Sequence, residues 1–169
     1  GSDNFFHQIT CMKNMKSGFR AKGGASHWVQ CKSFCNAEGD RFYHGGFLVE
    51  GTTNVFVDCE AQENFGTGWK VQNTKRISFV GCVANANGIT SYGQSVASDL
   101  QYHGFDIVGC VGVLFKGCIL HDFRKDAYNA QAQNVGVKID STSSRISGEL
   151  IADFQVTNFQ SASTTAISV

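Results

Sequence analysis

The sequence lacks proline, is poor in charged side chains and contains no long hydrophobic run. Charged residues make up 17% of the chain, below the ~25% of an average soluble domain, and 14 basic and 14 acidic residues give a formal net charge of zero. A neutral chain has no long-range field that would attract nucleic acid or an anionic membrane, so neither is expected as a partner. No apolar run approaches the ~18 residues of a membrane span, which excludes membrane insertion by such a helix. Helical periodicity is nowhere sustained, and Gly, Asn, Asp and Ser mark the turns.

Glycine and cysteine, by contrast, are frequent. The 19 glycines favour a turn-rich β fold over a helical bundle. Seven cysteines are an odd number, and several lie in apolar strand contexts, which argues against a secreted disulfide scaffold. Cys31 and Cys35 lack the second ligand pair of a zinc site. We therefore expect reduced, buried cysteines, no metal site and no cofactor; calcium bound by loop carboxylates is an alternative that no motif marks.

The length indicates one domain. A chain of 169 residues and 18.3 kDa has the size of a single hydrophobic core. Residues 1–2 (Gly-Ser) are interpreted as an expression scar, and residues 3–169 as a single domain that is a fragment of a longer protein.

The most informative feature is internal repetition. A cysteine followed two residues later by Ala or Ser and five residues later by Asn occurs as CKSFCN from Cys31, CEAQEN from Cys59 and CVANAN from Cys82. A second pattern, glycine followed by an apolar residue, any residue and Val or Ile, occurs as GFLV, GWKV, GFDI and GVKI, from Gly46, Gly68, Gly104 and Gly136. Both Gly68 to Cys82 and Gly104 to Cys118 span 14 residues. Such regular spacing predicts repeats of roughly 20–23 residues, interrupted by insertions.

Each repeat is predicted to contain three short strands. The first is FLV, WKV, FDI or VKI, the second VFV, ISF or VLF, and the third begins at the cysteine. Stacking buries their inward faces and places equivalent positions ~4.8 Å apart. We therefore expect an all-β solenoid with an internal ladder of cysteines. A second ladder of asparagines is expected at a corner with left-handed backbone, and His121 and Asp122 are expected to cap that corner in the repeat that lacks the asparagine.

The GFLV, GWKV, GFDI and N-V-x-V-x-C motifs, over roughly residues 25–155, resemble those of the pectate-lyase-like superfamily. The resemblance implies a right-handed parallel β-helix, here with about six coils and loop insertions at one corner. Proteins of this fold include polysaccharide lyases, glycoside hydrolases and phage tailspikes, which are typically homotrimers. The unpaired cysteines look most like those of a phage tail protein folded in the reducing bacterial cytoplasm.

The central residue of the first strand is expected to point outward. One outward column then contains Leu48, Lys70, Asp106 and Lys138, and the next contains Glu50, Gln72, Val108 and Asp140. These columns are interpreted either as a solvated charge ladder or as part of a carbohydrate groove. The outward residues of the other strands are predicted to be Phe56, Ser78, Leu114, Val83 and Ile119. Their apolar character suits contact within a homotrimer.

Three insertions at residues 37–45, 89–103 and 124–135 are expected to form a wall beside these columns. They contain every tyrosine of the chain: Tyr43, Tyr92, Tyr102 and Tyr128. Tyrosine suits stacking on sugar rings and also subunit interfaces. With Lys70 and Arg124, these tyrosines are the candidate substrate-binding residues.

The candidate catalytic residues are Asp106, Glu50, Asp140 and His103. A glycosidase needs two carboxyls ~5–5.5 Å or ~6.5–9.5 Å apart, and neighbouring coils would place stacked side chains near the shorter distance. A lyase needs instead a base, such as His103, and a cation, such as Lys70. No pair is singled out by the sequence, so whether the chain is a polysaccharide depolymerase stays open.

These features together predict a phage tail or tailspike module, carried on the virion, that binds a bacterial surface polysaccharide, with its depolymerisation as an option. The alternatives are a secreted polysaccharide lyase or glycoside hydrolase and a structural shaft without sugar contact.

Overall fold

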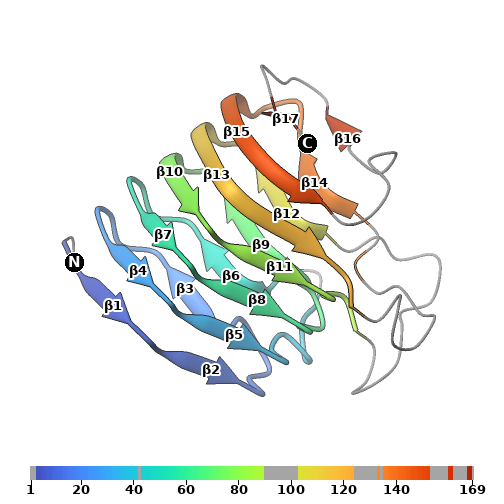
Figure 1. Ribbon diagram of the computed structural model, residues 1–169. Helices are drawn as coiled ribbons and strands as arrows, with labels where there is room; N and C mark the ends of the chain where they lie inside the picture. Colours follow the sequence, from blue (N-terminus) through green and yellow to red (C-terminus); the bar gives the residue numbers. More distant parts are fainter. Residues whose placement is uncertain are drawn as a thin grey trace.

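The computed structural model describes residues 3–41, 43–89, 103–123, 133, 135–152, 160–161 and 167–168. Within these ranges every regular element is a β-strand, and every strand pair is parallel (Figure 1). The strands are β1 (Phe5–His7), β2 (Thr10–Met12), β3 (Phe19–Ala21), β4 (His27–Val29), β5 (Lys32–Phe34), β6 (Gly45–Val49), β7 (Val55–Val57), β8 (Glu60–Gln62), β9 (Thr67–Gln72), β10 (Lys75–Val80), β11 (Val83–Asn85), β12 (His103–Val108), β13 (Val111–His121), β14 (Val135–Ile139), β15 (Ser144–Ala152), β16 (Gln160–Ser161) and β17 (Ile167–Ser168). A helix able to cross a membrane is not found in this part of the chain.

The strands stack in three columns. Column 1 contains β1, β4, β7, β10 and the first halves of β13 and β15; column 2 contains β2, β5, β8, β11 and the second halves of β13 and β15; column 3 contains β3, β6, β9, β12, β14 and β16. Since β13 runs through columns 1 and 2, both belong to one strongly curled sheet. The prediction of an all-β, solenoid-like fold of parallel strands is thereby confirmed.

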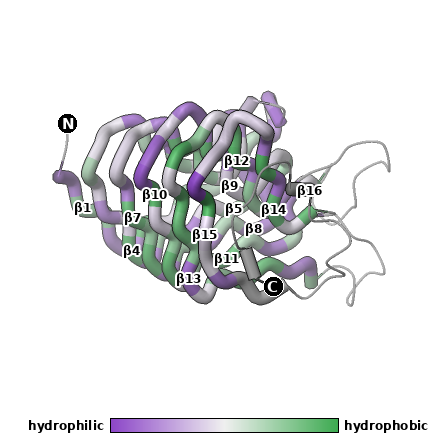
Figure 2. The backbone as a smooth tube through the Cα atoms, turned by 90° about the horizontal axis from the view of Figure 1, so that it is seen from above, coloured by the Kyte–Doolittle hydropathy of each residue, from purple (hydrophilic) through white to green (hydrophobic). Residues whose placement is uncertain are grey.

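Aromatic side chains form two parallel stacks in the core. In column 3, ring centroids are 4.7 Å apart for Phe19 and Phe47, 3.9 Å for Phe47 and Trp69, and 5.5 Å for Trp69 and Phe105. The stack of column 1 contains Trp28, Phe56, Phe79 and Phe115, and its rings meet those of column 3 edge to face. Stacking arises because equivalent residues of neighbouring layers lie one strand spacing apart. Hydrophobic stretches of neighbouring layers accordingly lie side by side along the stack (Figure 2).

The predicted phase of one second strand was wrong. Phe56 was expected to point outward, but it is fully buried and pairs with Phe79, whereas Val55 pairs with Ser78 on the outer face. The run Val-Phe-Val is apolar at every position, so its own pattern does not define an inward face. For β10 and β13 the prediction was correct: Ser78 is half-buried, and Leu114 is 44% exposed.

The predicted cysteine ladder is confirmed for Cys31, Cys59, Cys82 and Cys118, which are buried and equivalent in register. Three of them lie one residue before their strands, while Cys118 lies within β13. Cys11 is not part of the ladder, because it pairs with Ser33. All seven cysteines are free thiols.

Side-chain amides form the second predicted ladder. Asn14 Nδ2 donates to Asn36 Oδ1 (2.8 Å), Asn36 to Asn64 (3.3 Å), Asn64 to Asn87 (2.9 Å) and Asn87 to Gln133 Oε1 (2.8 Å). Gln133, rather than the predicted His121 or Asp122, thus completes the ladder in the layer that lacks the asparagine. Asp122 instead accepts a hydrogen bond from the Gln133 backbone N–H (2.7 Å).

The ladder explains the repeated glycines. A Cβ added at Gly68 would lie 2.7 Å from Asn87 Nδ2 and 2.8 Å from the Gly104 carbonyl oxygen, and Gly46 faces Asn64 equally closely. No side chain fits between the amides and the strands of column 3.

The left-handed backbone expected at this corner is present, but not at the asparagines themselves. The residues with positive φ are those before them, Cys35 (54°), Glu63 (49°) and Ala86 (51°). The preceding residue makes the turn, and the asparagine side chain remains inside the layer.

Candidate functional site

The outer face of column 3 brings together several predicted site residues. Lys70 of β9 pairs with Asp106 of β12, which pairs with Lys138 of β14, so the predicted alternation of charge is present. The position below Lys70 is Leu48, which is 3% exposed, and Asp106 is 8% exposed. These outward residues are largely shielded from water, unlike those of a solvated ladder.

Asp106 is incompletely satisfied. Its Oδ2 lies 4.0 Å from Lys70 Nζ, which is a loose ion pair. Its Oδ1 is buried and has no hydrogen-bond partner among the described residues. A buried carboxylate oxygen without a donor is costly, so Asp106 Oδ1 has an unused capacity to accept a hydrogen bond.

His103 begins β12, three residues before Asp106. Both ring nitrogens are buried and lack a hydrogen-bond partner in the described part of the chain. Burial lowers the pKa of His103 to about 4; the negative charge of Asp106 opposes this shift, and the positive charges of Lys138 and Lys70 add to it. The imidazole is therefore neutral at pH 7, with one nitrogen able to accept a proton or a hydrogen bond.

Glu50 belongs to a separate ion pair. It accepts hydrogen bonds from Arg20 Nε (2.7 Å) and Gln72 Nε2 (3.1 Å), and the bond from Arg20 lowers the pKa of Glu50 more than its partial burial raises it. The carboxylate is thus held in its charged form. Arg20 was not among the predicted residues; Gly18-Phe19-Arg20-Ala21 follows the glycine pattern except for its final alanine, and that similarity could have identified Arg20.

Asp140 lies in the turn after β14. Its Oδ1 accepts hydrogen bonds from the Gly109 backbone N–H (3.0 Å) and from Ser143 Oγ (2.6 Å), and Oδ2 accepts one from Thr142. Partial burial raises the pKa of Asp140, but these hydrogen bonds together lower it below its usual value. The contacts give Asp140 a structural role in joining two layers.

The described carboxylates do not stack in a pair. The register neighbours of Asp106 are the two lysines, and Glu50 is displaced from it by two layers and two residues, or roughly 12 Å at ordinary strand spacings. Asp140 is displaced from Asp106 by one layer and two residues, or roughly 8 Å, and its oxygens are engaged in the turn. This arrangement favours binding over two-carboxylate hydrolysis.

The predicted loop residues are mostly outside the described ranges. Tyr43 is 73% exposed, and its backbone N–H donates to Asp40 Oδ1 (3.2 Å). Tyr92, Tyr102, Tyr128 and Arg124 lie outside the residues that the structure describes. The order of the strands does confirm that all three insertions connect column 2 to column 3.

No group of three or more potential metal ligands occurs in the described ranges. Comparisons with models of protein families, with curated proteins and with solved structures found no match for this chain. The class of the protein is therefore defined by its fold alone, which is that of a parallel, solenoid-like all-β protein.

Proposed function

We propose that the chain is a right-handed parallel β-helix of about six coils, similar to the pectate-lyase-like proteins, and that it binds a bacterial surface polysaccharide as a module of a phage tail. The observation that carries this proposal is the Lys70, Asp106 and Lys138 column with its buried, unpartnered carboxylate oxygen.

Preorganisation of the column 3 face favours binding of a polysaccharide. Sugars present closely spaced hydroxyl groups along an extended chain, and a column of strands presents donors and acceptors ~4.8 Å apart on a rigid support. Because Lys70 and Asp106 are largely buried and already ordered, they lose little conformational freedom when a ligand binds. Asp106 Oδ1 gains the donor that it lacks.

The test is binding of the protein to purified capsular and O-antigen polysaccharides from a panel of bacteria. We expect Asp106→Asn and Lys70→Gln each to weaken binding by about tenfold or more, since each removes a charged hydrogen-bonding group. Asp58→Asn is the matched control, because Asp58 is exposed at a different corner, between columns 1 and 2. Binding to none of the polymers, or equal binding by all variants, would favour the structural shaft.

Placement on a virion, with folding in the bacterial cytoplasm, is supported by seven free thiols and the burial of six of them. A homotrimer is supported by exposed apolar side chains on column 2, among them Ile119, which is 39% exposed and pairs with Val83. Light scattering should then give a mass about three times 18.3 kDa. A monomer at all concentrations would contradict the trimer.

A second candidate, a polysaccharide lyase, is favoured by the neutral His103 near Lys70 and Lys138. Elimination would require His103 to take the C5 proton beside a sugar carboxylate whose charge a lysine neutralises. The C4–O glycosidic bond would break, a C4=C5 double bond would form, and the leaving oxygen would take a proton from water. Release of unsaturated, ultraviolet-absorbing sugars from an acidic polymer, abolished in His103→Gln, would establish it. Binding without such products would leave the chain as a binding module.

A further inference from the structure

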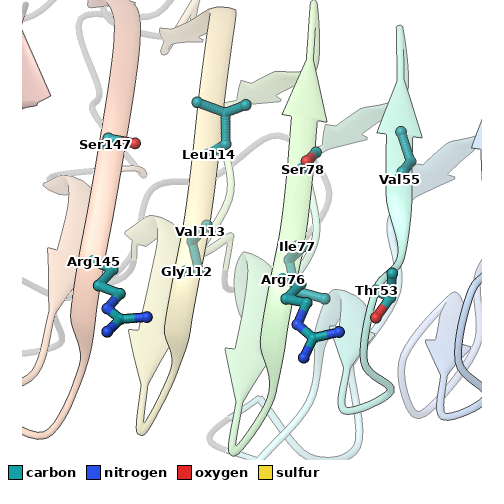
Figure 3. A pocket seen from close by; sticks show the side chains of 10 residues that line it. All are labelled: Thr53, Val55, Arg76, Ile77, Ser78, Gly112, Val113, Leu114, Arg145 and Ser147. Carbon is teal, nitrogen blue, oxygen red and sulfur yellow. The ribbon is translucent and has the colours of Figure 1, made fainter.

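A separate pocket of about 400 Å³ lies on the outer face of column 1, across β7, β10, β13 and β15 (Figure 3). Its lining residues are Thr53, Val55, Arg76, Ile77, Ser78, Gly112, Val113, Leu114, Arg145 and Ser147. None of them belongs to the column 3 face, and the volume is within the ~300–1,000 Å³ of small-molecule sites. Gly117, with a φ of 60°, separates the pocket from the column 2 half of β13.

Two arginines flank the pocket in equivalent positions. Arg76 and Arg145 are both register neighbours of Gly112, because Lys75 pairs with Val111, and Val111 with Ser144. Their backbones are therefore two strand spacings, about 9.6 Å, apart. Figure 3 shows both guanidinium groups on the same side of the sheet, with Gly112 between them. Glycine leaves this space open, since a Cβ there would approach only the backbone of Arg76 within 4 Å.

Neither guanidinium group is neutralised within the described ranges. The ion pairs of this part of the chain do not include Arg76 or Arg145, and both side chains are exposed. Two such forks across an open gap match the oxygens of one oxyanion, because guanidinium donates paired hydrogen bonds to carboxylate.

The rest of the pocket suits a sugar ring. Leu114, 44% exposed, offers an apolar surface for the C–H face of a pyranose, and Ser78 and Ser147 offer hydroxyls on either side of it. The tripeptide Arg-Ile-Ser occurs at residues 76–78 and again at 145–147, so both flanking strands supply the same guanidinium and hydroxyl groups. This repeat is the signal by which the sequence could have identified the pocket.

We infer that this pocket binds a carboxylated sugar residue, a hexuronate or a similar acid, with the carboxylate between Arg76 and Arg145 and the ring over Leu114. The choice of a sugar as ligand rests on the proposed function; the pocket itself is distinct from the column 3 face. The polysaccharide that the chain is proposed to bind is then an acidic one.

The test is an NMR titration of the isotope-labelled protein with glucuronate, with glucose and with inorganic sulfate. We expect glucuronate to shift the resonances of Leu114 and of the arginine side chains with millimolar affinity, sulfate to bind more weakly, and glucose not to bind. Arg76→Gln and Arg145→Gln should each weaken glucuronate binding by about tenfold or more. Glutamine is compatible with the positive φ of both positions, because Gln8 and Gln30 adopt the same conformation.

Lys116→Gln is the matched control, since it removes one positive charge from β13 outside the pocket and should leave binding unchanged. Equal affinity for glucuronate and glucose, equal affinity for glucuronate and sulfate, or unchanged binding by both arginine variants would overturn the inference. Asp106→Asn separates it from the proposed function: this variant should lose polymer binding at column 3 and retain glucuronate binding in the pocket.

Discussion

Replacement of Asn64 by alanine tests the amide ladder most directly. Asn64 Oδ1 accepts hydrogen bonds from the backbone N–H of Asn36 (3.0 Å) and from Ser33 Oγ (3.1 Å), and Nδ2 donates to Asn87 Oδ1 (2.9 Å). Ser33 Oγ and Asn87 Oδ1 retain other partners, the Gly46 carbonyl oxygen and the Asn64 backbone N–H. The Asn36 N–H has no second acceptor among the described residues and is left buried and unpaired.

The orphaned donor costs about 2 kcal/mol. The other four hydrogen bonds of the Asn64 side chain, which join it to Ser33 Oγ, the Ser33 carbonyl oxygen, Asn36 Nδ2 and Asn87 Oδ1, cost about 1 kcal/mol each, so Asn64→Ala should lower the free energy of unfolding by about 6 kcal/mol. Guanidinium chloride unfolding at fixed protein concentration, followed by circular dichroism, measures this difference. The control is Asn4→Ala, at an exposed residue with a single 3.5 Å side-chain hydrogen bond, which should cost less than about 0.5 kcal/mol. Equal effects of the two substitutions would refute the ladder as a source of stability.

Three further predictions follow from the packing and the titrating groups. Gly68→Ala should lower the free energy of unfolding by about 2–3 kcal/mol in the same assay, because the added Cβ would meet Asn87 Nδ2 and a backbone oxygen. Gly117→Ala should lower it by only about 1 kcal/mol, because Gly117 has a left-handed φ but open space around it. In the folded protein the pKa of His103 is about 4, whereas in the unfolded chain it has its ordinary value of about 6.5. The unfolded state therefore binds a proton at His103 more readily, and the free energy of unfolding should fall by about 3 kcal/mol as the pH decreases from about 6.5 to 4. That loss should disappear in His103→Gln; an unchanged pH profile would contradict the lowered pKa. Iodoacetamide should modify only Cys11 in the native protein and should reach the six other thiols after unfolding, which mass spectrometry can measure. Rapid modification of a ladder cysteine in the native protein would be inconsistent with its burial.

The repeats predicted most of the fold because stacking turns sequence spacing into spatial alignment. The glycine pattern placed Lys70, Asp106 and Lys138 in one column without knowledge of the insertions, since the pattern itself marks the strand. The fourth amide could not be predicted in this way. Gln133 lies 46 residues after Asn87, and no fixed spacing connects residues on opposite sides of an insertion.

The electrostatic details of the sites were beyond sequence spacing. Alternation places Asp106 on the outer face but gives neither its burial nor its unpartnered oxygen, which depend on the packing around it. Glu50 and Asp140 were equivalent to Asp106 as isolated carboxylates, and only their partners, Arg20 and the turn at Ser143, distinguish them.

The amide ladder also determines how the protein should respond to a pulling force. Hydrogen bonds between layers run along the stack, so tension applied to its two ends is carried by all layer boundaries in series, and the boundaries rupture one at a time. Successive ladder amides are 22, 28, 23 and 46 residues apart, so each rupture releases a different length of chain. At about 3.5 Å per extended residue, the steps are about 80, 100, 80 and 160 Å, and the last boundary yields the longest extension.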